Sequence, residues 1–302
     1  MHYCRFFAEL IGSRFGVFTG TEIVDLQHIN ERWTDFLSLY NHAKETNTPL
    51  DEVVREALLA TPSPFKAPWG SVQNPPGSDY PCLLTPLDPA ESWGAGVTYR
   101  QSALERDTDA KSLGGIYQQV YFAKRPELFF KATPARTIGP RDFAGIRPDS
   151  HLTMPEPELA VILDSDGTIL GYTIADDVSA WDIERENPLY LPQSKIFHGC
   201  LVIGPFIATP EEIPDPHNLK VELTLLRDGV QIFKGESNTS FMRKKIPELI
   251  AALLTSGPIP PGTLLSTGTG IMVPNESCLR PGDEVSIAIE NIGTLIHGVK
   301  AL

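Results

Sequence analysis

The sequence predicts an α+β protein rich in β-strands, with a small N-terminal α+β domain and a larger domain built mainly from strands. Short runs of β-branched and aromatic residues dominate the chain after Trp93. These runs do not alternate with helical patterns, which disfavours a doubly wound parallel sheet. The chain has 302 residues, a length at which about two domains are expected.

Composition and charge narrow the class of protein. Hydrophobic residues make up 41% and charged residues 21%, as in globular proteins. The net charge of −13 argues against nucleic-acid or anionic-membrane partners. We find no apolar run long enough to span a membrane and no signal peptide. The four cysteines are far apart and form no C-x-x-C pair, which indicates reduced thiols. We therefore expect a cytoplasmic protein.

The N-terminal domain is expected over 1–85 and the larger domain over 86–302. A strand or hairpin is predicted over Phe15–Val24. Two helices follow: the first is marked by apolar residues from Trp33 to Tyr40, and the second begins with Thr48 as its cap and Pro49 in its first turn. The stretch 61–90 contains eight prolines, which disfavour helices and central strands. We place the domain boundary in this stretch.

The larger domain is predicted to contain one helix near Ser240–Leu254 and several short strands. Asp166-Gly167 and Asp228-Gly229 lie between strand-like runs, which is typical of tight hairpins. The predicted strands are Glu127–Lys131, Glu158–Leu163, Thr168–Ile174, Ile196–Ile203, Val221–Leu226, Val230–Phe233 and Val285–Ile289.

One hairpin concentrates acidic residues. Residues two apart in a strand share a face, so Glu156 and Glu158 would point together. If Asp166-Gly167 forms a two-residue turn, paired positions sum to 333 and Asp177 lies opposite Glu156. A three-residue turn would instead bring Asp176 to the site.

Three converging carboxylates repel each other unless a cation lies among them. An all-oxygen ligand set without cysteine suits Mg²⁺, Mn²⁺ or Ca²⁺. The alternative is a solvated acidic edge, which Pro157 favours because it weakens regular strand pairing. Spacing alone leaves these two interpretations about equal.

The motifs in this region resemble those of the fumarylacetoacetate hydrolase superfamily. The resemblance spans roughly Trp93–Val299. Its motifs, in chain order, are Gly96-Val-Thr-Tyr-Arg100, Glu156-Pro-Glu158, Gly171-Tyr-Thr173, Asp176-Asp-Val-Ser-Ala180, Lys195-Ile-Phe197, Ile203-Gly-Pro205, Thr267-Gly-Thr-Gly270 and Pro281-Gly-Asp283. It implies a mixed β-sandwich roll for the larger domain.

The resemblance also implies a metal site. It makes Glu156, Glu158 and Asp177 the ligands, and it selects Asp177 because Asp176 occupies the family's usual Asn position. Mg²⁺ is the expected ion, with Mn²⁺ as the alternative.

Two departures bear on the reaction. Ser102 stands where hydrolytic members carry a His that activates water, and a serine hydroxyl is no base near neutral pH. Trp181 stands where many relatives carry an Arg that helps to bind substrate.

The stretches Arg125–Arg136 and Trp181–Pro188 resemble a dehydratase branch of the superfamily. This implies dehydration of a 2-keto-3-deoxy sugar acid, with 2-keto-3-deoxy-D-arabinonate giving 2,5-dioxopentanoate as the leading case. The branch implies catalytic roles for Glu127, as general acid/base, and Lys195, as a charge-stabilising partner; either could be the base at C3.

Substrate contacts are expected from Tyr99, Arg100, Ser102 and Thr269. The alternative reaction is metal-dependent C–C hydrolysis of an acylpyruvate, or decarboxylation of an oxaloacetate-type acid. Because members of the superfamily commonly form dimers or tetramers, we expect a homo-oligomer.

Overall fold

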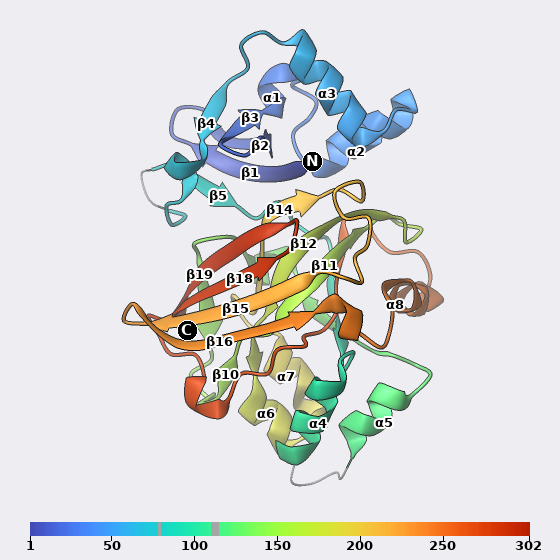
Figure 1. The fold of residues 1–302 in the computed structure, drawn as a ribbon, viewed down its shortest axis with the longest axis vertical. Helices are drawn as coiled ribbons and strands as arrows, with labels where there is room; N and C mark the ends of the chain where they lie inside the picture. The colour runs from blue at the N-terminus through green and yellow to red at the C-terminus, as the bar shows by residue number, and fades with distance from the viewer. Residues whose placement is uncertain (78–79, 110–114) are drawn as a thin grey trace.

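A computed structural model describes residues 1–77, 80–109 and 115–302. An N-terminal unit lies at one end of the molecule, two sheets form its body, and helices α4 to α7 lie at the opposite end (Figure 1). In the described part of the chain, no helix is both long and apolar enough to cross a membrane. The predicted class, α+β and rich in strands, is confirmed.

The N-terminal unit consists of a strand hairpin extended by short strands and packed against helices. The hairpin expected over Phe15–Val24 is present as β2 and β3, which turn around Gly20. The strands are β1 (His2–Ala8), β2 (Gly12–Phe18), β3 (Glu22–Asp25), β4 (Lys66–Pro68) and β5 (Cys82–Leu84). The helices are α1 (Leu26–Ile29), α2 (Phe36–Thr46), α3 (Leu50–Ala60) and the 3₁₀ turn η1 (Trp69–Val72).

The two helices predicted for this unit, α2 and α3, both begin later than predicted. Asp35 caps α2, since its side chain accepts a hydrogen bond from the Ser38 backbone N–H at 2.8 Å. Trp33 therefore lies outside the helix that it was expected to mark. The predicted Thr48 cap of α3 was wrong: Pro49 occupies the N-cap position, and its side chain makes no capping hydrogen bond.

The main sheet is continuous from the N-terminal unit into the larger domain. Twelve described strands belong to it, and its main path runs β4-β3-β2-β1-β14-β12-β11-β17-β6-β7. Strand β1 pairs with β14 through His2 and Ala208 and through Tyr3 and Ile207. Its other strands are β6 (Ser92–Gly96), β7 (Glu127–Ala132), β8 (Thr137–Ile138), β11 (Pro157–Leu163), β12 (Ile169–Asp177), β14 (Leu201–Ala208) and β17 (Thr263–Ser266).

A second sheet packs against the first, and a short ladder lies beside them. The second sheet has the order β16-β15-β18-β19-β9 and the ladder pairs β10 with β13. Their bounds are β9 (Phe143–Ile146), β10 (Thr153–Met154), β13 (Ser179–Ala180), β15 (Lys220–Arg227), β16 (Val230–Asn238), β18 (Glu284–Ile289) and β19 (Gly293–Ala301). The predicted strand Ile196–Ile203 was wrong in its first half, because β14 starts only at Leu201.

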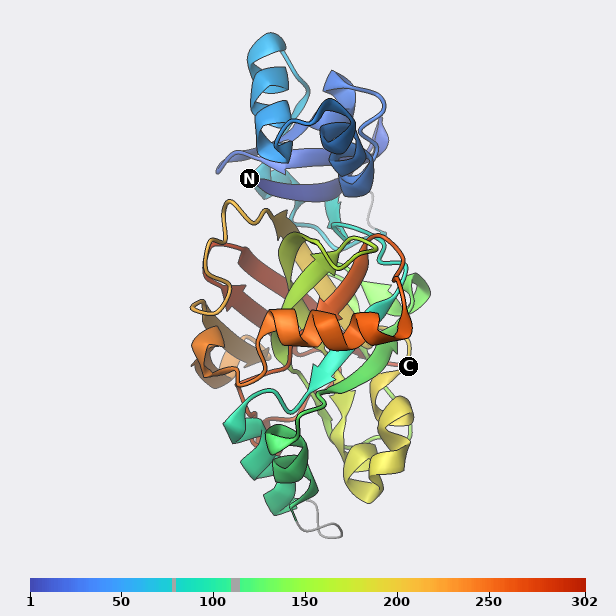
Figure 2. The same ribbon diagram turned by 90° about the vertical axis from the view of Figure 1, so that its right-hand side faces the viewer.

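Helices cover the ends and one face of the body. The predicted helix near 240–254 is shorter and forms α8 (Ile246–Leu253), which lies across the main sheet in Figure 2. The others are α4 (Arg100–Asp109), α5 (Ile116–Phe122), α6 (Trp181–Glu186) and α7 (Leu191–Lys195). Further 3₁₀ turns are η2 (Pro134–Arg136), η3 (Pro188–Tyr190), η4 (Thr239–Phe241), η5 (Leu254–Ser256) and η6 (Asn275–Ser277).

The acidic hairpin has the predicted register but not the predicted turn. Gly167 N–H donates to the Asp164 carbonyl at 3.0 Å, and Gly167 has a φ of +85°, so three residues form the loop. A bulge between Ile162 and Leu163 then restores the sum of 333, which pairs Glu158 with Ala175. The Asp228-Gly229 hairpin does have the two-residue turn, with φ values of 52° and 75°.

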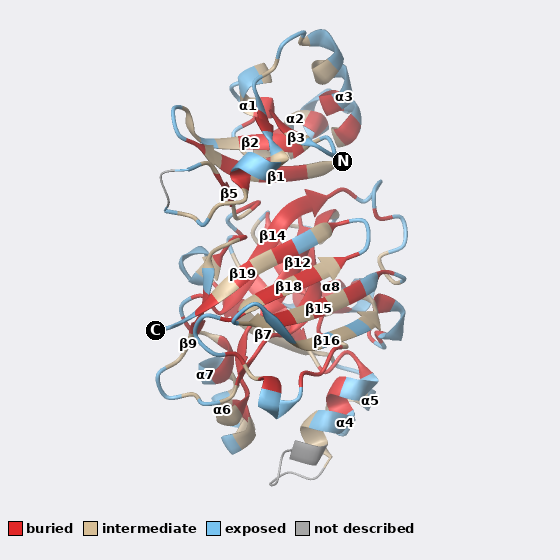
Figure 3. Ribbon diagram, turned by 60° about the vertical axis from the view of Figure 1, so that its left-hand side comes forward, coloured by how far each residue is buried: buried red, intermediate tan, exposed pale blue. Residues whose placement is uncertain are grey.

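The core lies where the central strands cross the body. Every residue of β11 and β14 is buried, and Figure 3 shows the β14 ribbon in red. One apolar cluster joins Phe36 and Leu39 of α2 to Ile174 of β12 and Ile207 of β14. The division into 1–85 and 86–302 stays a prediction. A continuous sheet and a shared apolar core connect the two parts.

Candidate metal centre and active site

Three carboxylates meet where β11 begins and β12 ends. Glu158 lies on β11, Glu156 directly precedes that strand, and Asp177 is the last residue of β12. Asp177 N–H donates to the Glu156 carbonyl at 3.0 Å, so the backbone holds the two residues opposite each other. Each side chain offers an oxygen within 4.8 Å of the others. All three residues are at most 3% exposed.

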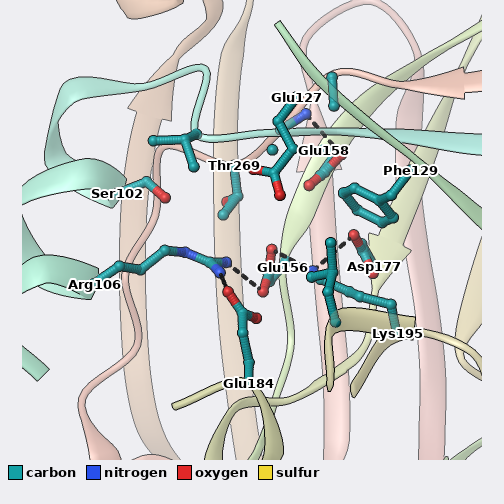
Figure 4. A pocket seen from close by; sticks show the side chains of 15 residues that line it. Ser102, Arg106, Glu127, Phe129, Glu156, Glu158, Asp177, Glu184, Lys195 and Thr269 are labelled. Atoms are coloured by element: carbon teal, nitrogen blue, oxygen red, sulfur yellow. Dashed lines mark hydrogen bonds and ion pairs between the residues drawn. The ribbon is translucent and has the colours of Figure 1, made fainter. Parts of the chain in front are cut away.

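Three basic side chains surround this triad. Lys195 Nζ lies 2.9 Å from Asp177 Oδ2 and 3.1 Å from Glu156 Oε2. Lys131, fully buried on β7, lies with Nζ 2.6 Å from Asp177 Oδ1 and donates to the carbonyls of Val178 and Lys195. Arg106 Nη2 lies 2.8 Å from Glu156 Oε1. Figure 4 shows Arg106 and Lys195 approaching the triad from opposite sides.

The three carboxylates differ in how far their charge is compensated. Burial opposes the charge of Glu156, but Arg106 and Lys195 outweigh it and lower the pKa of Glu156. Burial, followed by the charges of Asp177 and Glu156, raises the pKa of Glu158 well above its usual range. The negative charge of ionised Glu158 is therefore poorly compensated, although Gly268 N–H donates to its Oε2 at 2.7 Å and Ser266 Oγ also donates to it.

The residues of the triad fit a hard divalent cation. All donors are carboxylate oxygens, the type that Mg²⁺ and Mn²⁺ prefer. A cation would also relieve the repulsion that raises the pKa of Glu158. No other group of three or more possible ligands is found among the described residues.

Neighbours fix the ligands in place. Asp176 Oδ1 accepts a hydrogen bond from the Glu156 backbone N–H at 2.7 Å. His297, on β19 of the second sheet, contacts Asp176 Oδ2 through Nε2 at 2.9 Å. Trp181 Nε1–H donates to Glu156 Oε1 at 2.7 Å. Asp176 thus supports the backbone of a ligand while Asp177 faces the site, as the family motif implies.

Glu127 faces the same pocket from the first residue of β7. It pairs with Gly96 of β6, and a Cβ placed on Gly96 would lie only 2.2 Å from Glu127 Oε2, so the glycine leaves room for the carboxyl group. Burial, followed by the charge of Glu184, raises the pKa of Glu127. A carboxyl group with a raised pKa can hold a proton closer to neutral pH and is suited to acid–base chemistry.

The pocket brings together seven of the nine site residues predicted from the sequence. They are Ser102, Glu127, Glu156, Glu158, Asp177, Lys195 and Thr269. The cavity has a volume of about 10 Å³, room for about one water molecule. A larger ligand therefore enters only when lining side chains move.

Tyr99 and Arg100 lie elsewhere. Both line a separate, larger pocket of about 610 Å³ together with Tyr121, Phe241 and Gly270. Tyr99 is 4% exposed, and burial, followed by the charge of Glu158, raises its pKa. Its ring is thus near the site without lining its cavity, and the substrate contacts of Tyr99 and Arg100 stay predictions.

Sequence reasoning missed several residues of the site. Arg106 and Glu184 line the pocket and form an ion pair, and Lys131 neutralises Asp177. Glu184 lies in the stretch Trp181–Pro188, whose resemblance to the dehydratase branch was the one available signal. Lys131 lies in the stretch Arg125–Arg136, which carries the same resemblance, whereas Arg106 has no local pattern that distinguishes it from surface residues.

The fold and the site define a β-rich protein in which a buried carboxylate triad that fits a metal ion lies beside a carboxyl group with a raised pKa. Residues 92–300 match the family model described as fumarylacetoacetate (FAA) hydrolase C-terminal. The chain therefore belongs to the fumarylacetoacetate hydrolase family.

Two curated relatives are similar over most of their length. The chain is 53% identical over 222 residues to 2-dehydro-3-deoxy-D-arabinonate dehydratase of Saccharolobus solfataricus, which covers 72% of this chain and 74% of the relative. It is 45% identical over 214 residues to a probable 2-keto-3-deoxyxylonate dehydratase of Haloferax volcanii, with 71% and 73% covered.

A solved structure extends the similarity to the whole chain. The structure of 2-keto-3-deoxy-D-arabinonate dehydratase complexed with magnesium and 2,5-dioxopentanoate matches with a TM-score of 0.80 and 38% identity. The match covers 100% of this chain and 99% of that one.

Proposed function

We propose that this protein is a magnesium-dependent dehydratase of 2-keto-3-deoxy sugar acids, with 2-keto-3-deoxy-D-arabinonate as substrate and 2,5-dioxopentanoate and water as products. The observation that carries the proposal is the meeting of a buried carboxylate triad with Lys195 and Glu127 in one pocket. The two curated relatives and the magnesium-containing structure support the same reaction.

The residues of the pocket suit the two halves of a dehydration. Glu156, Glu158 and Asp177 would hold the cation, which when bound withdraws electrons from a keto group and acidifies the neighbouring C–H. Lys195 places its positive charge beside Glu156 and Asp177. It would stabilise the negative charge that develops on the keto oxygen. Glu127 would exchange protons at C3 and at the departing C4 hydroxyl.

The hydrolytic alternative lacks its water-activating group. Ser102 lines the pocket at the position of the family's His, and in the described part of the chain no histidine lines this cavity. Because a serine hydroxyl cannot act as the base, loss of the substrate's own hydroxyl is favoured over attack by water.

The direct test is an assay on 2-keto-3-deoxy-D-arabinonate with detection of the aldehyde product. We expect turnover with Mg²⁺, loss of turnover with EDTA and recovery when Mg²⁺ is restored. Glu158→Gln is expected to lose at least about 100-fold in kcat/KM, because one ligand loses its charge. The control Glu211→Gln changes an exposed carboxylate and should leave activity unchanged.

Two outcomes would contradict the proposal. Full activity in EDTA would exclude a metal-dependent step. Formation of pyruvate plus a second acid from an acylpyruvate, without turnover of the sugar acid, would favour the hydrolase.

Two further expectations belong with this proposal. We propose that the protein is cytoplasmic, as its scattered cysteines indicate. We also propose a homo-oligomer, a dimer or tetramer, because that is the usual state of the family. Light scattering of the purified protein measures the assembly directly.

A further inference from the structure

The wall of the pocket contains a buried carboxylate that the proposed reaction does not use. Glu184, on α6, is 4% exposed and lines the cavity. Its Oε1 accepts hydrogen bonds from Arg106 Nη1–H and, at 3.2 Å, from the Tyr117 hydroxyl. Its Oε2 is buried and has no hydrogen-bond partner among the residues that the structure describes. A buried carboxylate oxygen without a partner is costly, so a ligand that donates to it is favoured.

Arg106 is arranged in the same way. Its two Nη groups contact Glu184 Oε1 and Glu156 Oε1, whereas its buried Nε–H has no hydrogen-bond partner in the described part of the chain. The guanidinium also lies over the ring of Trp181, 5.3 Å from the centroid, and near that of Tyr117, at 5.9 Å. Arg106 is thus held between two aromatic rings and contacts one oxygen of Glu184, while the other oxygen of Glu184 has no partner among the described residues.

The Arg106 guanidinium therefore lies between Glu156 of the triad and the Glu184 carboxylate. Under the proposed function, the keto acid end of the substrate lies at the triad and the C3–C4 bond lies near Glu127. Figure 4 shows Glu127 and Glu184 entering the pocket from opposite sides, with Glu156 between them. A five-carbon chain that presents C3 and C4 to Glu127 from the triad can direct its C5 carbon to the other side of the pocket, toward Glu184, where the C5 hydroxyl can donate to the free oxygen.

We propose that Glu184, held by Arg106 and Tyr117, is a specificity-determining residue that binds the hydroxyl at the end of the sugar acid opposite its keto group. Glu184 Oε2 accepts from that hydroxyl. The pair selects 2-keto acids with a C5 hydroxyl over those that end in a methyl group. This inference rests on the proposed function for the placement of the keto acid end.

Two ligands that cannot be dehydrated test the contact by itself. 5-Hydroxy-2-oxopentanoate and 2-oxopentanoate share the keto acid end and lack a C4 hydroxyl, so they differ only at C5. With Mg²⁺ present, calorimetry should show that the unchanged protein binds the hydroxylated acid at least about 10-fold more tightly, the range of a hydrogen bond to a charged group. Equal affinities would overturn the proposal without any variant.

The variant Glu184→Gln tests the residue. Its amide oxygen remains with Arg106, whose guanidinium can only donate, so its NH₂ faces the cavity in place of the free oxygen. We expect the 10-fold preference to fall to about 3-fold or less, while binding of 2-oxopentanoate changes little. A preserved preference would contradict the assignment. Glu186→Gln, an exposed change on the same helix, is the matched control.

Turnover separates this inference from the proposed function. If the protein dehydrates 2-keto-3-deoxy-D-arabinonate, kcat/KM for 4-hydroxy-2-oxopentanoate should be at least about 10-fold lower, and Glu184→Gln should narrow that gap. Absence of turnover on either acid would count against the dehydratase. An equal kcat/KM for both would count against Glu184 alone.

Discussion

At the scale of single residues, the site depends on space as much as on charge. Gly96 is the residue across from Glu127 in the β6–β7 pair, and its missing side chain accommodates the Glu127 carboxyl group. In the sequence, the motif around Gly96 indicated only a resemblance to the family. The contact gives a physical reason for the glycine at this position.

Gly96→Ala should reduce activity while leaving the fold intact. The new Cβ would meet Glu127 Oε2 at 2.2 Å and Cδ at 2.7 Å, and the flexible end of Glu127 can move away from it. We expect kcat/KM to fall about 100-fold, because a shift of about 1 Å misplaces an acid–base group. The free energy of unfolding should change by less than about 1 kcal/mol.

Steady-state kinetics and urea denaturation measure the two effects. Glu127→Gln serves as the reference for complete loss of the acid–base group. Full activity of Gly96→Ala would show that the position of Glu127 is not critical for the reaction.

At the scale of elements, the β11–β12 hairpin determines which aspartate faces the metal site. Its three-residue loop by itself would shift the register, and the bulge near Leu163 shifts it back. Loop and bulge together bring Asp177 opposite Glu156. Asp176 is thereby left to support the backbone and to contact His297.

Glycines in the two hairpin turns provide a matched pair of substitutions. Gly167 and Gly229 have φ values of +85° and +75°, so an alanine is strained by about 1–2 kcal/mol in both. Only Gly167 is also crowded, since its Cβ would lie 2.6 Å from Leu254 Cδ1 and 2.7 Å from Ile250 Cγ2. We expect Gly167→Ala to destabilise the protein by at least about 1 kcal/mol more than Gly229→Ala.

Chemical denaturation of both variants measures the difference. Equal losses of stability in the two variants would mean that α8 and η5 can move aside without a measurable cost in free energy. In that case the packing of these helices would not help to fix the hairpin.

At the scale of the whole molecule, the N-terminal unit shares both a sheet and a core with the larger domain. Strand β1 pairs with β14, which also borders β12. The Tyr3 hydroxyl, on β1, donates to Asp51 Oδ1 at 2.8 Å, and Thr209, directly after β14, donates to Asp51 Oδ2 at 2.8 Å. The two predicted domains are therefore expected to unfold together.

Phe36→Ala tests this expectation. Phe36 is fully buried on α2, and its ring approaches Gly171 of β12. Its removal should cost about 3–5 kcal/mol and should lower the temperature of one single transition in calorimetry. Two separate transitions, with only one of them moved, would instead show independent domains.

The sequence by itself determined the features that depend on local pattern. Runs of β-branched and aromatic residues predicted most of the strands, Asp-Gly pairs predicted both hairpins, and the E-x-E spacing predicted that Glu156 and Glu158 point together. The resemblance to the family then supplied Asp177 as the third expected ligand and Glu127 as the expected acid–base group, because its short motifs keep their order along the chain.

Only the tertiary structure determined the partners that come from distant segments. Arg106, Lys131, Glu184 and His297 reach the site from four different elements, and no spacing along the chain relates them to the triad. The physical reason is that a buried carboxylate needs compensating charge and hydrogen bonds from whichever side chains folding places beside it.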